Sequence, residues 1–198
     1  DLWVSRVEAS AHEEGTVYVT LTGYREDDFR AYAYRSDDQG ATWTSIAEDL
    51  PDQQINVIRE DPADPTRVYV GSDQGGVYVS ADRGESWTAL SADLPTTPVH
   101  DMAIQARERE MVIATHGRSF FKLDLDPVQG WSDEVAARPV HLFPIRPALL
   151  PQRRDYGGDW AFETRQPAVF HVSLAEAGPL EVRVLGEEEG EQEVLWSE

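Results

Sequence analysis

Residues Ser36–Trp43 read SDDQGATW and residues Ser80–Trp87 read SADRGESW, so both follow the pattern S-x-D-x-G-x-[T/S]-W. Each stretch lies between two short apolar runs, which is typical of the turn of a β-hairpin. An Asp carboxylate can accept backbone N–H groups within such a turn, and Gly supplies a positive φ. The closing Trp is expected to begin the next strand and to bury a large ring.

A repeat extends well beyond the turn. The first residues of the two copies, 36 and 80, stand 44 positions apart, and Asp49–Pro51 is copied by Asp93–Pro95 at the same offset. Aligning Tyr18, Tyr69 and Ile113 gives steps of 51 and 44 residues. Four short strands in a repeat of about 45 residues are typical of a β-propeller blade. We therefore expect an all-β chain that holds two complete four-stranded antiparallel blades and most of a third.

Both copies resemble the Asp-box, also called the bacterial neuraminidase repeat, which occurs in sialidases, xyloglucanases and sortilin-type receptors. A wider resemblance, from Val4 to about Asp126, is to the last propeller blades of bacterial sortilin-like proteins that are often labelled glycosyl hydrolases. The segments that carry it are Ile55–Pro62, Tyr69–Gly71, Pro98–Asp101 and Ala114–Arg118. The resemblance implies an Asp-box β-propeller but no particular activity, because such propellers host both enzymes and receptors.

The pattern along the chain predicts three segments. Residues 1–126 are expected to form the propeller blades, and residues 127–166 a Pro-rich linker that wraps the propeller. Residues 167–198 resemble the start of the Ig-like β-sandwich that follows the propeller in these bacterial proteins, truncated before a sandwich is complete. Because a closed propeller takes roughly 4–8 blades, the expected partners are the remaining blades of a longer parent chain.

The composition is strongly acidic, with 37 Asp and Glu against 17 Lys and Arg, a formal net charge of −20 and no cysteine. Such a chain is a poor partner for nucleic acid and for anionic membrane surfaces. The acidity, with Lys122 as the only lysine, favours a salt-adapted, halophilic protein; a cation-binding face is the alternative. No apolar run approaches the length of a membrane span, so we expect no membrane insertion. No leader is visible in this stretch, but in a fragment its absence says nothing about export. We expect a secreted protein in an extracellular or periplasmic location.

We interpret the Asp-box residues as structural, because their side chains are needed for the turn's own N–H groups. They are Ser36, Asp38, Gly40, Thr42, Trp43, Ser80, Asp82, Gly84, Ser86 and Trp87. The alternative is a calcium loop, in which Glu48 would be the twelfth position counted from Asp37. The strand that Trp43 begins interrupts such a loop, so we expect no metal ion and no cofactor.

His100, Asp101, His116 and Arg118 are the candidate ligand-binding residues. His100 and Asp101 begin a predicted innermost strand, whereas His116 and Arg118 lie in the turn between the next two strands. Together they could bind an anionic or sugar ligand near the mouth of the central channel. The alternative is a structural role in closing the ring, with Arg118 bridging neighbouring blades and His116 bonded to the backbone.

No catalytic constellation can be assigned from the sequence. Sialidase chemistry needs three arginines, a tyrosine nucleophile with an acidic partner and an aspartic acid, and xyloglucanase chemistry needs two carboxylates that flank the scissile bond. Arg6, Arg59 and Arg118 recur in successive repeats without a telling spacing, and acidic residues are too numerous for one pair to stand out. We therefore expect a non-catalytic binding or scaffolding segment, with a peptide or polysaccharide ligand. The alternative is part of a sialidase- or xyloglucanase-like glycoside hydrolase whose catalytic residues lie in other blades, which leaves enzyme activity open.

Overall fold

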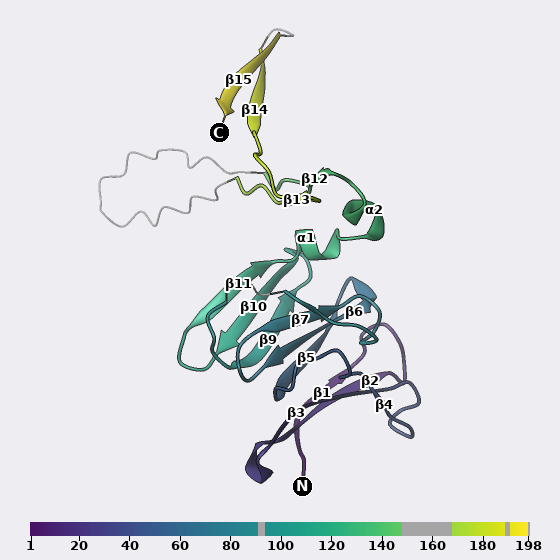
Figure 1. Cartoon of the computed structure of the whole chain (residues 1–198). Coiled ribbons are helices and arrows are strands. Elements are labelled where there is room, and N and C mark those ends of the chain that lie inside the picture. Colours follow the sequence, from purple (N-terminus) through teal and green to yellow (C-terminus); the bar gives the residue numbers. More distant parts are fainter. Residues whose placement is uncertain (91–93, 148–167, 189–190, 198) are drawn as a thin grey trace, which may run out of the picture. The chain divides into compact units, whose positions relative to one another are not determined.

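The computed structural model describes residues 1–90, 94–147, 168–188 and 191–197 (Figure 1). Contacts divide the chain into two units, residues 1–129 and 130–198. Within the described residues, helix is confined to three short segments, η1 (Tyr24–Glu26), α1 (Asp126–Gln129) and α2 (Asp133–Ala136). The remaining regular structure is antiparallel strand, which confirms the all-β prediction.

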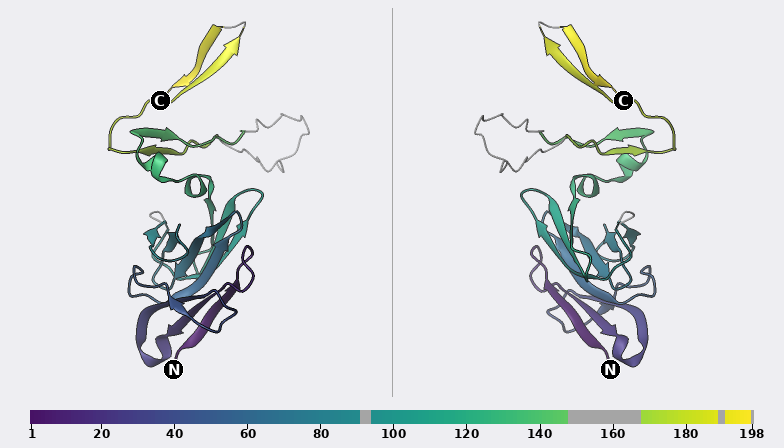
Figure 2. Two further views of the ribbon diagram at one scale, coloured as in Figure 1. Left: turned by 90° about the vertical axis from the view of Figure 1, so that its right-hand side faces the viewer. Right: turned by 90° about the vertical axis from the view of Figure 1, so that its left-hand side faces the viewer.

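Unit 1 contains three antiparallel sheets that lie side by side in chain order (Figures 1 and 2). The first is a four-stranded meander of β1 (Trp3–Ala9), β2 (Val17–Gly23), β3 (Asp28–Ser36) and β4 (Thr44–Ser45). The second repeats it with β5 (Ile55–Asp61), β6 (Asp64–Ser72), β7 (Val77–Ser80) and β8 (Thr88–Ala89). These are the two complete blades that the repeat predicts, and each Asp-box connects the third strand of its blade to the fourth.

The third sheet has three strands, β9 (Val99–Gln105), β10 (Glu110–Thr115) and β11 (Phe120–Asp124), in the order β11-β10-β9. Where the other blades continue through an Asp-box into a fourth strand, this blade continues into α1. Among the described residues, no strand pairs with the outer edge of β11. This sheet therefore has three of the four strands of a blade, and it ends without an Asp-box.

Apolar side chains fill the layers between neighbouring blades. The layer between the first and second blades is built from Tyr18, Ala33, Ile46, Leu50, Ile55, Ile58, Val68 and Val70. The layer between the second and third is built from Val57, Tyr69, Val77, Val99, Met102, Met111, Ile113 and Leu125. Alternate residues of β6 enter opposite layers, because successive side chains of a strand face opposite sides of the sheet. Burying each of the larger side chains contributes about 1.5–3 kcal/mol, so these layers hold the blades together.

The first Asp-box is a turn closed by its own side chains. The Ser36 hydroxyl accepts the backbone N–H groups of Asp38 (3.3 Å) and Gly40 (2.8 Å). The Asp38 carboxylate accepts the N–H of Thr42 (2.8 Å) and also the Thr42 hydroxyl (2.6 Å). These hydrogen bonds, with that of the Thr42 hydroxyl the strongest cause, lower the pKa of Asp38 to about 2. This is the bonding that a structural role for the motif requires.

The second Asp-box repeats this arrangement. Ser80 accepts the N–H groups of Asp82 (3.2 Å) and Gly84 (2.7 Å), and Asp82 accepts the N–H of Ser86 (2.9 Å) and its hydroxyl. Burial raises the pKa of Asp82, but the hydrogen bonds from Ser80 and Ser86 outweigh it and leave this pKa below its ordinary value. Gly84 has a φ of +95°, and a Cβ there would lie 2.8 Å from the Cβ of Ile46. Only glycine fits where this turn meets the first blade.

The two Asp-box tryptophans differ in burial. Trp87 packs against the layer between the first two blades, and its indole Nε1 donates to the carbonyl of Ile46 at 2.7 Å. Trp43 is 44% exposed, so the expectation that it buries its ring is wrong for this chain. The physical reason is that the Asp-box tryptophan of the second blade packs on the preceding blade, and the described residues form no sheet in that position for the first blade.

Unit 2 contains α2 and two separate antiparallel ribbons. β12 (Val140–Leu142) pairs with β13 (Val172–Leu174), and β14 (Arg183–Glu188) pairs with β15 (Glu191–Ser197). The Ig-like β-sandwich stays a prediction, and most of the predicted linker, residues 148–166, lies outside the described residues. In the described parts of the chain, no helix is both long and apolar enough to cross a membrane.

Candidate functional site

Arg59 joins the innermost strands of all three blades. From β5, its Nη1 donates to Glu8 Oε2 on β1 at 2.8 Å, and its Nη2 donates to Asp101 Oδ1 on β9 at 2.7 Å. Its Nε donates to the carbonyl of Met102 at 2.7 Å. The Arg59 side chain is only 18% exposed, so these bonds are partly shielded from water. A guanidinium suits this position because its donors are held in a fixed plane.

Asp101 is the common acceptor of two arginines. Its Oδ1 lies 2.9 Å from Arg6 Nη2 and 2.7 Å from Arg59 Nη2, and it also accepts the backbone N–H of Met102 at 2.9 Å. The structure therefore brings Asp101 to Arg6 and Arg59. Because Arg6 and Arg59 both bind this oxygen, Asp101 connects neighbouring blades.

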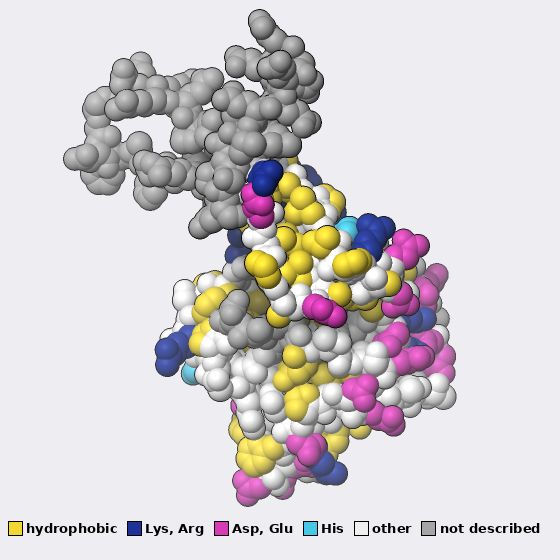
Figure 3. Space-filling view, turned by 45° about the horizontal axis from the view of Figure 1, so that its top comes forward, with side chains coloured by type: hydrophobic (Ala, Val, Ile, Leu, Met, Phe, Trp, Pro, Cys, Tyr) yellow, Lys and Arg dark blue, Asp and Glu magenta, His cyan; other side chains and the backbone are white. Residues whose placement is uncertain are grey.

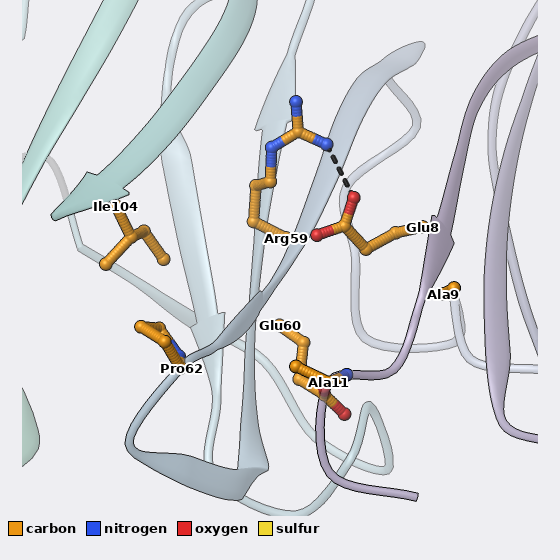
Figure 4. A pocket seen from close by; sticks show the side chains of 7 residues that line it. All are labelled: Glu8, Ala9, Ala11, Arg59, Glu60, Pro62 and Ile104. Atoms are coloured by element: carbon orange, nitrogen blue, oxygen red, sulfur yellow. Dashed lines mark hydrogen bonds and ion pairs between the residues drawn. The ribbon is translucent and has the colours of Figure 1, made fainter. Parts of the chain in front are cut away.

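A cavity of about 250 Å³ opens beside Arg59 (Figure 4). It is lined by Glu8, Ala9, Ala11, Arg59, Glu60, Pro62 and Ile104, which come from the innermost strands and the loops that follow them. The Glu60 carboxylate accepts the Ser10 hydroxyl at both oxygens (2.8 and 2.9 Å) and the N–H of Ala11 at 2.8 Å. Glu60 is thereby held in place by the turn between β1 and β2.

Glu8 also lines the cavity, and the sequence did not single it out. Burial raises its pKa, the charge and hydrogen bond of Arg59 lower it by less, and the nearby Glu60 carboxylate adds to the rise. A carboxyl group with a raised pKa in a cavity is a property of general acids. The signal in the sequence is that Glu8 and Arg59 stand 51 residues apart, the same step as Tyr18 and Tyr69, and so occupy equivalent inner-strand positions.

His100 and His116 lie beside each other at one end of the third blade. Their ring centres are 5.0 Å apart and their planes are tilted by 37°. His100 belongs to β9, and His116 follows β10 in the turn to β11. The His116 N–H donates to the carbonyl of Pro98 (2.9 Å), and its carbonyl accepts the Thr97 hydroxyl (3.1 Å). Of the four predicted site residues, these two are the ones that the fold brings into contact.

Arg118 lies in the same turn, after Gly117, whose φ is +80°. It makes no hydrogen bond or ion pair with any described residue. The structural alternative was that Arg118 bridges neighbouring blades. In the structure, Arg59 bridges the blades through Glu8 and Asp101. Arg118 follows His116 by two residues and has no bond to a described residue, whereas Asp101 is bound by Arg6 and Arg59.

Asp37, where the calcium alternative would begin, is engaged by cationic side chains. Arg83 Nη2 lies 2.8 Å from Asp37 Oδ1, and Arg35 Nε lies 3.1 Å from Oδ2. The Thr16 hydroxyl also donates to Oδ1 at 3.0 Å. Because Arg83 belongs to the second Asp-box, this network links the two Asp-box turns. In the described part of the chain, no three or more His, Cys, Asp or Glu side chains are grouped to hold a metal ion.

Comparison with known proteins gives one family. The family model Sortilin-Vps10, described as sortilin, neurotensin receptor 3, matches residues 31–132, just over half of the chain. Among curated proteins, no sequence matches this chain.

Solved structures of similar fold include three GH74 proteins. A GH74 enzyme from Niastella koreensis has 15% sequence identity and a TM-score of 0.52, covering 61% of this chain and 21% of its own. A GH74 xyloglucanase from Xanthomonas campestris has 20% identity and a TM-score of 0.49, covering 64% and 21%. An ancestral GH74 enzyme has 17% identity and a TM-score of 0.47, covering 58% and 14%. This chain thus spans about a fifth or less of those proteins, and the likeness concerns the fold alone.

Proposed function

This chain belongs to the Sortilin-Vps10 family, and we propose that it is a non-catalytic binding or scaffolding segment of a sortilin-like Asp-box propeller protein. Its ligand is a peptide or a polysaccharide, held at the channel end of the third blade. The remaining blades of a parent chain complete the propeller, and the protein works in an extracellular or periplasmic location.

The observation that carries the proposal is the engagement of the channel-side carboxylates. Asp101 accepts two arginines, Glu60 accepts Ser10 and Ala11, and Glu8 accepts Arg59. Glycoside hydrolysis needs one protonated carboxyl and one free carboxylate on either side of the scissile bond. Carboxylates tied to arginines and backbone groups serve to hold blades together, which supports a binding role for this segment.

The binding surface that we propose consists of His100, His116 and Arg118. The histidine rings are exposed at the end of β9 and in the β10–β11 turn, and Arg118 has no bond to a described residue. Imidazole and guanidinium groups bind carboxylates and hydroxyls, which are the polar groups that peptides and glycans present. Replacing Arg118 with Gln is expected to weaken ligand binding without changing the melting temperature.

The second candidate function is a glycoside hydrolase, and the raised pKa of Glu8 is the observation that favours it. In that case Glu8 would act as the general acid in the cavity beside Arg59, with a second carboxylate supplied by another blade. In this candidate one of the two catalytic carboxyl groups would lie within residues 1–126.

One experiment separates the two candidates. The full-length parent protein is screened against chromogenic glycosides, polysaccharides and a peptide library, with Glu8→Gln and the exposed Glu108→Gln as matched variants. Saturable binding without turnover supports the proposal. Turnover that Glu8→Gln abolishes and Glu108→Gln leaves intact would refute it and establish the hydrolase.

A further inference from the structure

We infer that His100 and His116 form a binding site for one transition-metal ion of the Zn²⁺ or Cu²⁺ class. This site shares His100 and His116 with the binding surface proposed above, but metal binding at the pair requires no peptide or polysaccharide. It differs from the calcium loop considered at Asp37, because its ligands are imidazole nitrogens on the third blade.

The separation of the two rings suits a shared ion. Imidazole nitrogens bind Zn²⁺ at about 2.0–2.1 Å, so the centres of two rings that meet one ion at a tetrahedral angle stand roughly 5 Å apart. The ring centres of His100 and His116 are 5.0 Å apart, with their planes tilted by 37°. This separation of the ring centres is the one that two imidazoles bound to a single ion require.

The backbone next to both rings is hydrogen-bonded. His100 is the bulge residue of β9, between Asp101, which pairs with Ala114 of β10, and Val99, which pairs with Thr115. Both the N–H and the carbonyl of His116 are hydrogen-bonded, to Pro98 and Thr97. The turn that follows is closed by Thr115, whose N–H (3.2 Å) and hydroxyl (2.7 Å) both donate to the Ser119 carbonyl. Ligands on a fixed backbone lose little conformational entropy when they bind an ion.

The ring nitrogens of this pair are available. Neither ring makes a hydrogen bond or an ion pair with a described residue, and both side chains are exposed. By contrast, His12 Nε2 lies 2.8 Å from the carbonyl of Asp61, and His141 Nδ1 lies 3.2 Å from Arg138 Nη1. Two adjacent imidazoles without protein partners are acceptors that only water or a ligand can satisfy.

The chemistry of the donors selects the ion. Imidazole suits zinc, copper and nickel, whereas Ca²⁺ and Mg²⁺ prefer oxygen ligands. Since no third His, Cys, Asp or Glu joins the pair among the described residues, water or a bound anion would fill the other positions. The net charge of −20 raises the local concentration of cations around the chain.

The test uses the metal-free full-length parent protein, titrated with CuCl₂ and with ZnCl₂ by calorimetry in the absence of peptide or glycan. The variants are His100→Ala and His116→Ala, with His141→Ala as the matched control. We expect one ion for the pair, and a loss of about tenfold or more in affinity in each of the first two variants, since even outer-shell changes at metal sites cost 10–100-fold. Electron paramagnetic resonance of bound Cu²⁺ should show nitrogen ligands that disappear in the double variant.

The inference is overturned if the wild-type protein binds no ion, if the double variant binds as tightly as wild type, or if His141→Ala causes the same loss. Arg118→Gln keeps the two proposals distinguishable, because it should weaken peptide or glycan binding and leave the affinity for the metal ion unchanged.

Discussion

The indole Nε1 of Trp87 donates a hydrogen bond of 2.7 Å to the backbone carbonyl of Ile46. The Asp-box tryptophan of the second blade is thereby anchored on the residue that follows the outermost strand of the first. Gly84 of the same turn also lies against Ile46, because a Cβ at Gly84 would stand 2.8 Å from the Cβ of Ile46. The second Asp-box thus closes its own turn and also packs against the first blade.

The first prediction is that the two Asp-box tryptophans contribute unequally to stability. Trp87→Ala should lower the free energy of unfolding by about 3 kcal/mol, because it removes a packed ring and leaves the Ile46 carbonyl without its donor. Trp43→Ala, at a ring that is 44% exposed, should cost less than about 1 kcal/mol in the chain of residues 1–198. Urea unfolding of the two variants checks this, and equal losses would contradict the asymmetry.

The blades themselves were predictable because their signals are local. The Asp-box pattern, its return after 44 residues and the short apolar runs all lie within a few residues of the turns they specify. The exposure of the Trp43 ring was not predictable in this way, since the burial of an Asp-box tryptophan depends on a surface from another blade. Local patterns fix the turn, but they do not show whether its neighbour is present.

The third repeat shows a second limit. The sequence aligns Ile113 with Tyr69. In the structure Ile113 corresponds to Val70, because each faces the preceding blade. The residue that corresponds to Tyr69 is Val112. The third repeat is one residue shorter at this point, and a slip of one residue reverses every side chain of a strand. The pairing of Asp101 with Arg59, 42 residues away, was likewise out of reach, because it depends on how neighbouring blades pack.

The second prediction concerns Arg59. Arg59→Met removes the cation bound to the partly buried Glu8 and one of the two arginines bound to Asp101, which keeps Arg6. We expect a loss of about 2–4 kcal/mol in the free energy of unfolding, below the roughly 3–5 kcal/mol of a fully buried pair because water reaches these groups. Arg107→Met is the matched control, since Arg107 is 83% exposed in its pair with Glu108; it should change stability by less than about 0.5 kcal/mol. Similar values for both variants would show that the bridge is dispensable.

The third prediction is a loss of stability in acid that comes from the Asp-boxes. The pKa of Asp38 is lowered to about 2 in the fold, and the pKa of Asp82 is lowered as well, against about 3.9 for an unfolded Asp. A lowered folded pKa gives stability that is present above about pH 4 and is lost as the pH falls toward 2. The melting temperature should therefore drop between pH 5 and pH 2.5, and it should drop less in Asp38→Asn and Asp82→Asn. The exposed Asp49→Asn is the control, and an equal flattening there would contradict the assignment.

The last prediction concerns the acidic surface. Asp and Glu side chains gather along one side of the described surface in Figure 3, and the chain carries a formal net charge of −20. Like charges at this density repel one another in the folded state, and added salt screens the repulsion over a Debye length that shrinks from about 10 Å at 0.1 M to about 3 Å at 1 M.

Raising KCl from 0.1 to 1 M should therefore increase the melting temperature, and NaCl should do the same, because screening does not depend on the identity of the cation. If millimolar CaCl₂ alone produced the increase and KCl did not, the cation-binding face would replace salt adaptation as the explanation. Replacing three exposed acidic residues, Glu14, Asp49 and Asp52, with Gln or Asn should reduce the KCl effect. A KCl effect that stayed unchanged would show that the repulsion lies elsewhere on the surface.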